Sequence, residues 1–115
     1  MTTHQGHCHC GAVRFEMDSA VDSALQCNCS FCIRRGTTIH RVPADNFRLL
    51  AGEDQLNCYG SREFSDHYFC RTCGIQCFSR VNFGDEPVVM VNLGCFDPDL
   101  LAGIEPSLFD GASKL

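Results

Sequence analysis

The sequence lacks tryptophan, long apolar runs and any excess of positive charge, and the last two absences exclude whole classes of protein. In 115 residues, 9 Lys and Arg stand against 14 Asp and Glu, which gives a formal net charge of −5. Binding of nucleic acid depends on neutralising phosphates with Lys and Arg, so this acidic chain is not expected to have a nucleic acid as its partner. No stretch approaches the roughly 20 apolar residues that span a bilayer, so no membrane partner is expected either.

The N-terminal segment also lacks the features of a secretory signal. MTTHQGHCHCGAVRFEMD contains no basic region followed by an apolar segment. We therefore expect a cytoplasmic protein, in a reducing setting where clustered cysteines serve as metal ligands more often than they form disulfides. The last three residues, Ser-Lys-Leu, match a peroxisomal address, which has meaning only in a eukaryote.

Several common catalytic motifs are missing as well. The chain has no phosphate-binding P-loop, no G-x-G-x-x-G and no G-x-S-x-G, and its acidic residues are scattered rather than paired. It also has no internal repeat and no linker rich in Pro, Gly or Ser. We therefore expect a single domain over residues 1–115. No feature indicates an oligomeric state.

Short segments typical of β-strands, separated by turn signals, make up most of the chain. Val13, Phe15 and Met17 alternate with more polar residues, which is the pattern of a strand with one buried face. Similar segments lie at residues 37–42, 56–59, 67–69, 75–81 and 87–93. The sequence therefore predicts a mainly β domain of mostly antiparallel strands.

Two short segments favour helical turns instead. Residues 30–35 can form one turn, and residues 97–102 can form another. In the second segment Asp97 is expected to cap the N-terminus and Pro98 to occupy the first helical position.

Two pairs among the ten cysteines have the spacing of metal ligands. They are C8-H-C10 and C70-R-T-C73-G, and the second has the form of a zinc knuckle. If both pairs bind one ion, they supply four thiolates and form a closed, structural zinc site. Spacing alone leaves other arrangements open, because either pair can instead combine with the cysteines at 27–32, and disulfides are the alternative to metal.

Three further cysteines, Cys27, Cys29 and Cys32, lie within six residues. Three protein ligands leave one coordination position for water or a substrate thiol, which is the arrangement of catalytic zinc. Arg34 and Arg35 follow directly and are expected to favour thiolates there and to bind a substrate carboxylate. The alternative is a second structural zinc, whose fourth ligand would come from a histidine or from Cys58, Cys77 or Cys95.

The other cysteines and the histidines carry weaker expectations. Cys58 and Cys77 lie in strand-like segments and are expected to be ordinary buried cysteines, whereas Cys95 has no assigned role. His7 and His9 are expected to lie at the surface or beside the metal ligands, and His40 and His67 are expected to be structural.

Three segments together resemble the glutathione-dependent formaldehyde-activating enzyme family, which also includes centromere protein V. They are G6-H-C-H-C-G-A-V-R-F-E16, C27-N-C-S-F-C32 and F69-C-R-T-C-G74. The resemblance continues through F47-R-L-L-A-G52, L56-N-C-Y59 and V91-N-L-G94, and so spans nearly the whole chain. It implies a small β-tent-like domain of antiparallel sheets with zinc-knuckle motifs.

The resemblance also implies two zinc ions per chain and their ligands. One is a structural zinc held by Cys8, Cys10, Cys70 and Cys73, which we call the four-cysteine cluster. The second is held by Cys27, Cys29 and Cys32, which we call the three-cysteine cluster.

The resemblance and the open ligand set together predict a zinc-dependent carbon–sulfur lyase, similar to S-hydroxymethylglutathione synthase. Its partners would be a small-molecule thiol of the glutathione type and a small aldehyde, whose adduct it forms or cleaves. The alternative is a non-catalytic zinc module that binds a protein partner or carries a thiol or a metal. A three-cysteine cluster open to a cleft favours the enzyme, and a cluster sealed under a fourth ligand favours the module.

Overall fold

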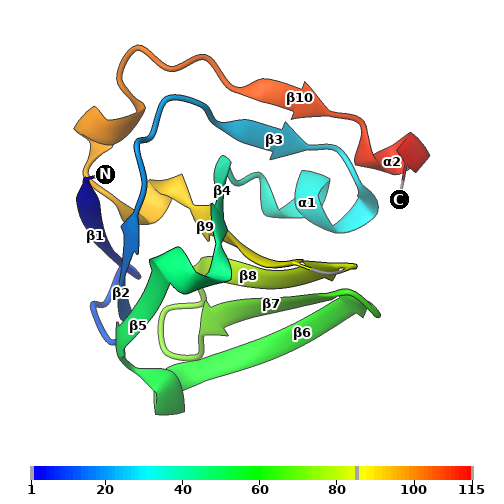
Figure 1. Ribbon diagram of the computed structural model, residues 1–115. Helices are drawn as coiled ribbons and strands as arrows, with labels where there is room; N and C mark the ends of the chain where they lie inside the picture. Colours follow the sequence, from blue (N-terminus) through cyan, green and yellow to red (C-terminus); the bar gives the residue numbers. More distant parts are fainter. Residues whose placement is uncertain (1, 85, 115) are drawn as a thin grey trace.

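The strands form two sheets, as predicted for a mainly β protein (Figure 1). The structure is a computed structural model and describes residues 2–84 and 86–114. The smaller sheet has the order β1-β2-β5 and consists of β1 (Thr3–His7), β2 (Arg14–Asp18) and β5 (Phe47–Ala51). The larger sheet has the order β10-β3-β4-β9-β8-β7-β6. Its strands are β3 (Leu25–Cys27), β4 (Ile39–Pro43), β6 (Leu56–Arg62), β7 (Ser65–Cys70), β8 (Gln76–Phe83), β9 (Glu86–Asn92) and β10 (Ser107–Phe109).

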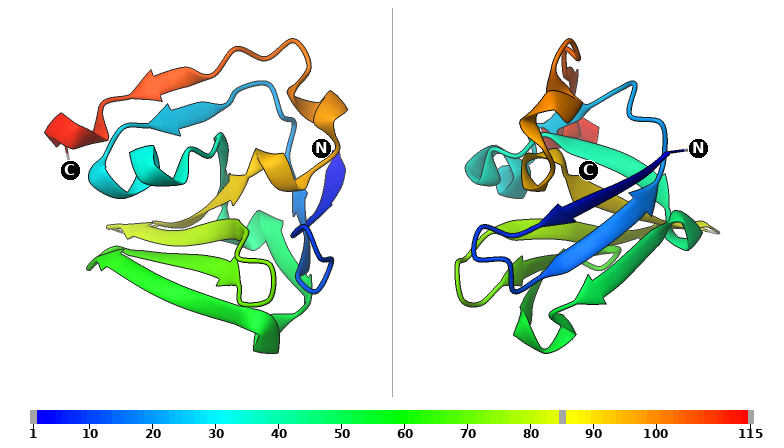
Figure 2. Two further views of the ribbon diagram at one scale, coloured as in Figure 1. Left: turned by 180° about the vertical axis from the view of Figure 1, so that it is seen from behind. Right: turned by 90° about the vertical axis from the view of Figure 1, so that its left-hand side faces the viewer.

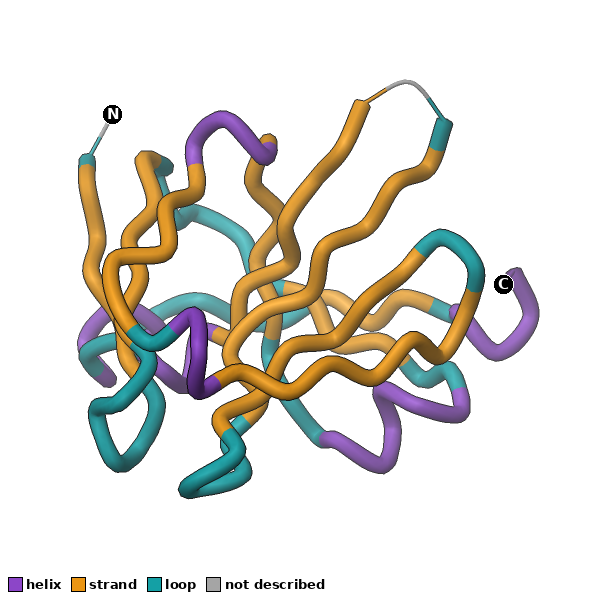
Figure 3. Tube along the Cα trace, turned by 90° about the horizontal axis from the view of Figure 1, so that it is seen from below, coloured by secondary structure: helices purple, strands orange, loops and turns teal. Residues whose placement is uncertain are grey.

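Neighbouring strands in both sheets are antiparallel, with one exception among the described residues. The exception is β10, which pairs with β3 in parallel. The hairpins β6–β7 and β8–β9 lie side by side in the larger sheet (Figure 3). The strands β3 and β10 run together on the other side of α1 (Ser30–Arg35) from β8 and β9 (Figures 1 and 2).

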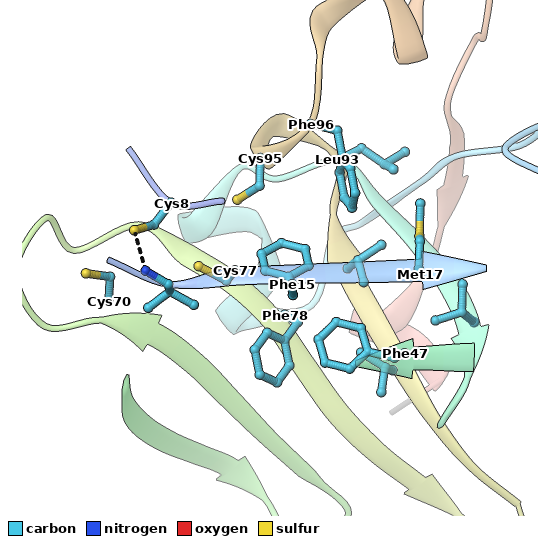
Figure 4. Close-up of a cluster of buried hydrophobic side chains, with 14 of the residues drawn as sticks. Cys8, Phe15, Met17, Phe47, Cys70, Cys77, Phe78, Leu93, Cys95 and Phe96 are labelled. Carbon is cyan, nitrogen blue, oxygen red and sulfur yellow. Dashed lines mark hydrogen bonds between the residues drawn. The ribbon is translucent and has the colours of Figure 1, made fainter. Parts of the chain in front are cut away.

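The buried face of β2 lies against the larger sheet and forms the core (Figure 4). Phe15 and Met17 are fully buried, and Val13 is buried just before the strand begins, so the predicted alternation is confirmed. The ring of Phe15 lies 5.7 Å from that of Phe47 and 6.0 Å from that of Phe78, centroid to centroid. The apolar face of the smaller sheet therefore packs against β8.

The helical turns predicted at residues 30–35 and 97–102 are both present. In α1 the Cys29 side chain caps the N-terminus by accepting a hydrogen bond from the Cys32 N–H, and Gly36 ends the helix with a φ of 68°. The second turn is the 3₁₀ helix η4 (Pro98–Leu101), which begins with the predicted Asp97 cap. The remaining short helices are η1 (Ala44–Asn46), η2 (Glu53–Gln55), η3 (Leu93–Cys95) and α2 (Gly111–Lys114). Among the described residues, no helix has the length and apolar character needed to cross a membrane.

The expectation for Cys58 was wrong, whereas that for Cys77 is confirmed. Cys58 is exposed, because β6 is the last strand of the larger sheet and has a neighbour on only one side. Cys77 is buried in the core, with Cys95 beside it (Figure 4).

Candidate metal centres and active site

The four-cysteine cluster forms where the two sheets meet. Its sulfur atoms all lie within 4.8 Å of one another. The Cys10 sulfur is 3.6 Å from the sulfurs of both Cys8 and Cys70. Four sulfurs bound tetrahedrally to zinc at about 2.3 Å would lie about 3.8 Å apart, so this arrangement fits a tetrahedral ion.

The local backbone of both cysteine pairs stabilises negative charge on the sulfurs. The Val13 N–H donates to the Cys8 sulfur and the Thr72 N–H donates to the Cys70 sulfur, each at 3.4 Å. Gly74 adopts a φ of 79°, a left-handed conformation that glycine tolerates and that turns the chain back after Cys73. Such N–H···S hydrogen bonds lower the cost of gathering four thiolates around one ion.

This cluster connects segments that are distant in the sequence. Cys8 and Cys10 lie between β1 and β2 of the smaller sheet, whereas Cys70 and Cys73 lie at the turn from β7 to β8 of the larger sheet. An ion held by all four residues would therefore join the two sheets at one end of the core.

The three-cysteine cluster is built from one continuous segment. Cys27 ends β3, Cys29 caps α1, and Cys32 lies within α1; their sulfurs are also within 4.8 Å of one another. The N–H groups of Cys29 and Cys32 donate to the sulfurs of Cys27 and Cys29, respectively, each at 3.4 Å. Burial by itself would raise the pKa of Cys29, but hydrogen bonds from the backbone and from the neighbouring thiols lower it to about 7.

The C-terminal segment holds this loop in position through Asn28, the residue between the first two cysteines. The Asn28 N–H donates to the Phe109 carbonyl oxygen at 3.2 Å. The Asn28 side chain donates to Asp110 at 3.1 Å and accepts from the Ala112 N–H at 2.9 Å. The loop is therefore fixed to the end of β10 and to the residues that follow it, a contact that sequence spacing could not reveal.

No fourth ligand closes the three-cysteine cluster within the described residues. No other cysteine, histidine or carboxylate ligand atom of the described residues lies within 4.8 Å of all three sulfurs. The sulfurs instead line a cavity of about 240 Å³, together with Arg35, His67 and Ser79. This is the open arrangement that favours an enzyme over a sealed module.

The side chains of the two arginines after the cluster lie in different surroundings. Arg34 is exposed and donates back to the Ser30 carbonyl oxygen of its own helix at 2.7 Å. Arg35 is half-buried and donates to the Cys32 sulfur at 3.1 Å and to the Ser79 hydroxyl at 3.4 Å. The Nε of Arg35 is buried without a hydrogen-bond partner among the described residues. Of these two arginines, only Arg35 lines the cavity.

His67 belongs to the wall of the cavity, although the sequence predicted only a structural role for it. It lies opposite Ser79 across β7 and β8, with its Nδ1 2.6 Å from the Ser79 hydroxyl oxygen. That oxygen also accepts hydrogen bonds from Arg35 and from Gln76. With both lone pairs engaged, the hydroxyl donates its hydrogen to Nδ1, so the neutral ring carries its own hydrogen on Nε2.

The surroundings keep His67 uncharged at neutral pH. Burial, and then the positive charge of Arg35, lower the pKa of His67 to about 4, against a small opposing effect of Asp66. The ring also stacks on Phe31 of α1, with centroids 3.9 Å apart and planes inclined by 16°. A single histidine in a strand gave no signal of this role, because the neighbours that create it come from β8 and α1.

The comparisons with known proteins agree with these features. The model of the family described as glutathione-dependent formaldehyde-activating enzyme matches residues 3–109. A crystal structure of a Rhodobacter sphaeroides protein is similar to this chain with a TM-score of 0.79 and 32% sequence identity, over 91% of this chain and 99% of that one. The resemblance seen in the cysteine motifs is thereby confirmed, and this chain belongs to the glutathione-dependent formaldehyde-activating enzyme family.

Proposed function

We propose that this protein is a carbon–sulfur lyase that forms or cleaves the adduct of a glutathione-like thiol with a small aldehyde. The family description names glutathione and formaldehyde as the reactants. The observation that carries the proposal is the three-cysteine cluster, which is open to a cavity and has Arg35 and His67 beside it. We further propose that the reaction takes place in the cytoplasm, where thiols are kept reduced.

Zinc is the metal that suits both clusters, since each offers only cysteine sulfurs, all within 4.8 Å of one another. We assign a structural zinc to the four-cysteine cluster and a second zinc to the three-cysteine cluster. When bound there, the second ion would supply a Lewis acid that favours the thiolate form of the substrate or polarises the aldehyde carbonyl.

The reaction itself requires positioning and one proton transfer. The thiol sulfur forms a bond to the carbonyl carbon, the π electrons of the carbonyl move to its oxygen, and that oxygen takes up the proton that the thiol has lost. The guanidinium of Arg35, which lines the cavity, can donate to the oxygen as negative charge develops on it. His67 stays neutral and holds the Ser79 hydroxyl in the cavity wall, while the proton lost by the thiol reaches the oxygen through solvent.

The test measures the rate of exchange between the free reactants, glutathione and an aldehyde, and their adduct. The rate is measured at equilibrium by exchange NMR, with the zinc-loaded protein present. Formaldehyde and hexanal are used in parallel. We expect the wild type to accelerate exchange with at least one aldehyde. With Cys29→Ser we expect exchange at the uncatalysed rate only. Cys58→Ser is the matched control, because Cys58 is exposed and belongs to neither cluster.

Two results would contradict the proposal. One is a zinc-loaded wild type that accelerates neither reaction, which favours the non-catalytic module. The other is a Cys29→Ser variant as active as Cys58→Ser, which removes the three-cysteine cluster from the chemistry.

A further inference from the structure

The floor of the cavity is one face of the larger sheet. Arg41, Met90, Ser79 and His67 are cross-strand neighbours on β4, β9, β8 and β7, and all four line the cavity. Ser79 and His67 form the polar end of this row, where Arg35 joins them. These three groups are thus gathered at one side of the floor, and the exposed Arg41 stands at the opposite end of the row.

The rest of the lining is largely apolar. It consists of Leu25, Ile39, Phe64, Val81 and Phe109, with Ser65 as its one polar member. Leu25 and Phe109 come from the β3–β10 pair, in which Phe109 lies opposite Cys27. The hydrocarbon walls therefore begin directly beside the three-cysteine cluster.

Glutathione does not fit this space. It carries two carboxylates, an ammonium group and two amides. The exposed Arg41 can meet one carboxylate, but burying the remaining groups against apolar walls without partners costs several kcal/mol. The volume of about 240 Å³ is also below the range of roughly 300–1,000 Å³ typical of sites for molecules of that size. A polar thiol must therefore keep most of its structure outside the cavity.

Formaldehyde fits the space but leaves most of it unused. Its two heavy atoms need about the volume of one water molecule, roughly 30 Å³. An apolar cavity of about 150 Å³ already accommodates benzene, so about 240 Å³ of mostly apolar space has room for a larger hydrocarbon group.

We propose that the cavity binds the hydrocarbon group of the aldehyde, and that the preferred aldehydes carry an alkyl or aryl group of about six to eight carbons rather than being formaldehyde. The assignment of the carbonyl to the cluster end of the cavity rests on the proposed function. The carbonyl oxygen then lies at the cluster end of the cavity, beside the guanidinium of Arg35, and the chain extends along Met90 and Val81 toward the apolar walls. The thiol reaches the carbonyl carbon from outside, by the same bond changes as with formaldehyde.

Binding can be measured without the reaction. Straight-chain primary amides present a carbonyl that does not add thiols, so acetamide to octanamide are titrated into the zinc-loaded protein by calorimetry. We expect binding to tighten about three- to fourfold with each methylene group until the cavity is full, and then to level off. Equal affinity along the series would overturn the inference.

Variants show whether the binding occurs in this cavity. Phe109→Ala enlarges the cavity and should move the levelling-off to longer amides, while Leu108→Ala should bind the series as the wild type does. Leu108 is the matched control because it neighbours Phe109 on β10 and is 73% exposed. If Phe109→Ala does not fold, Met90→Phe, which changes the shape of the floor, should alter the affinity for octanamide by at least fivefold and leave that for acetamide unchanged. A folded cavity variant that binds the whole series like the wild type would overturn the inference.

Rates with glutathione separate this inference from the proposed function. Acceleration with formaldehyde and hexanal alike, together with flat amide binding, would leave the lyase intact and refute the apolar preference. Amide binding that depends on chain length, without acceleration for any aldehyde, would support an apolar ligand and refute the lyase.

Discussion

Replacing Cys70 by serine is expected to prevent cooperative folding, whereas replacing Cys29 by serine is expected to leave a folded domain. The two residues belong to clusters that connect very different lengths of chain. Cys10 and Cys70, whose sulfurs are in contact, lie 60 residues apart, while the whole three-cysteine cluster lies within residues 27–32. The metal in the first cluster therefore constrains the unfolded chain far more than the metal in the second.

The magnitude follows from loop closure. A crosslink that closes about 60 residues stabilises by roughly 4 kcal/mol, and one that closes about five residues by roughly 2 kcal/mol. The binding energy of a structural zinc, about 10–16 kcal/mol, also becomes folding energy in the four-cysteine cluster, and it equals or exceeds the total stability of a typical domain. We therefore expect no cooperative transition for Cys70→Ser and a decrease in Tm of about 10 °C for Cys29→Ser.

The assay is thermal unfolding followed by circular dichroism, with the zinc content of each variant measured beside it. Cys77→Ser is the control for placing a hydroxyl in the core, because Cys77 is as fully buried as Cys70 but belongs to neither cluster. It should unfold cooperatively, at a Tm below that of the wild type. If Cys29→Ser unfolds the domain as completely as Cys70→Ser, the second site is structural and the reasoning is refuted.

Four further measurements follow from the same structure. The purified protein should contain about two zinc ions per chain by elemental analysis, and a folded, active protein without metal would contradict both sites. Alkylation under denaturing, chelating and non-reducing conditions should find the thiols of the four-cysteine cluster free, and intact disulfides among them would refute the metal assignment. Burial and Arg35 hold the pKa of His67 at about 4, below its value of about 6.5 in an unfolded chain. Between these two pH values the unfolded chain therefore takes up a proton that the folded chain does not. The wild type should therefore lose stability relative to His67→Asn as the pH falls from 7.5 to 5, and parallel Tm values over that range would contradict the buried neutral histidine. Duplex DNA should not bind with sub-micromolar affinity at physiological salt, because the net charge is −5, and tight binding with a steep salt dependence would contradict this expectation.

The elements that the sequence predicted are those with a strong local pattern. Alternation around Phe15 identified β2, and the cap formed by Asp97 identified η4. By contrast, β1 contains only one buried residue, Gly6, so it has no apolar alternation to detect. The three residues of β10 are too few to show a period, and they form a strand only because β3 lies beside them. Both strands therefore depend on the strand beside them, which for β1 is the next in the chain and for β10 is distant in the sequence.

The candidate site was likewise predictable from the sequence only in part. The ligand sets were visible because cysteine pairs with short spacing carry their chemistry in the sequence. The cavity was not visible, because it depends on the register that aligns His67 with Ser79 and Ser79 with Met90. Exposure of Cys58 was missed for a related reason, since the sequence does not say which strand ends a sheet.

The central claim is that the three-cysteine cluster holds a metal whose remaining coordination position belongs to the substrate. The most direct test of this claim is a crystal structure, determined with added thiol and with anomalous scattering at the zinc edge. We predict two zinc peaks per chain. One should be surrounded by the four-cysteine cluster, and the other should be bound by Cys27, Cys29 and Cys32, with the sulfur of the added thiol as its fourth ligand. A second ion enclosed by four protein ligands, or no zinc at the three-cysteine cluster in a fully loaded protein, would contradict the claim.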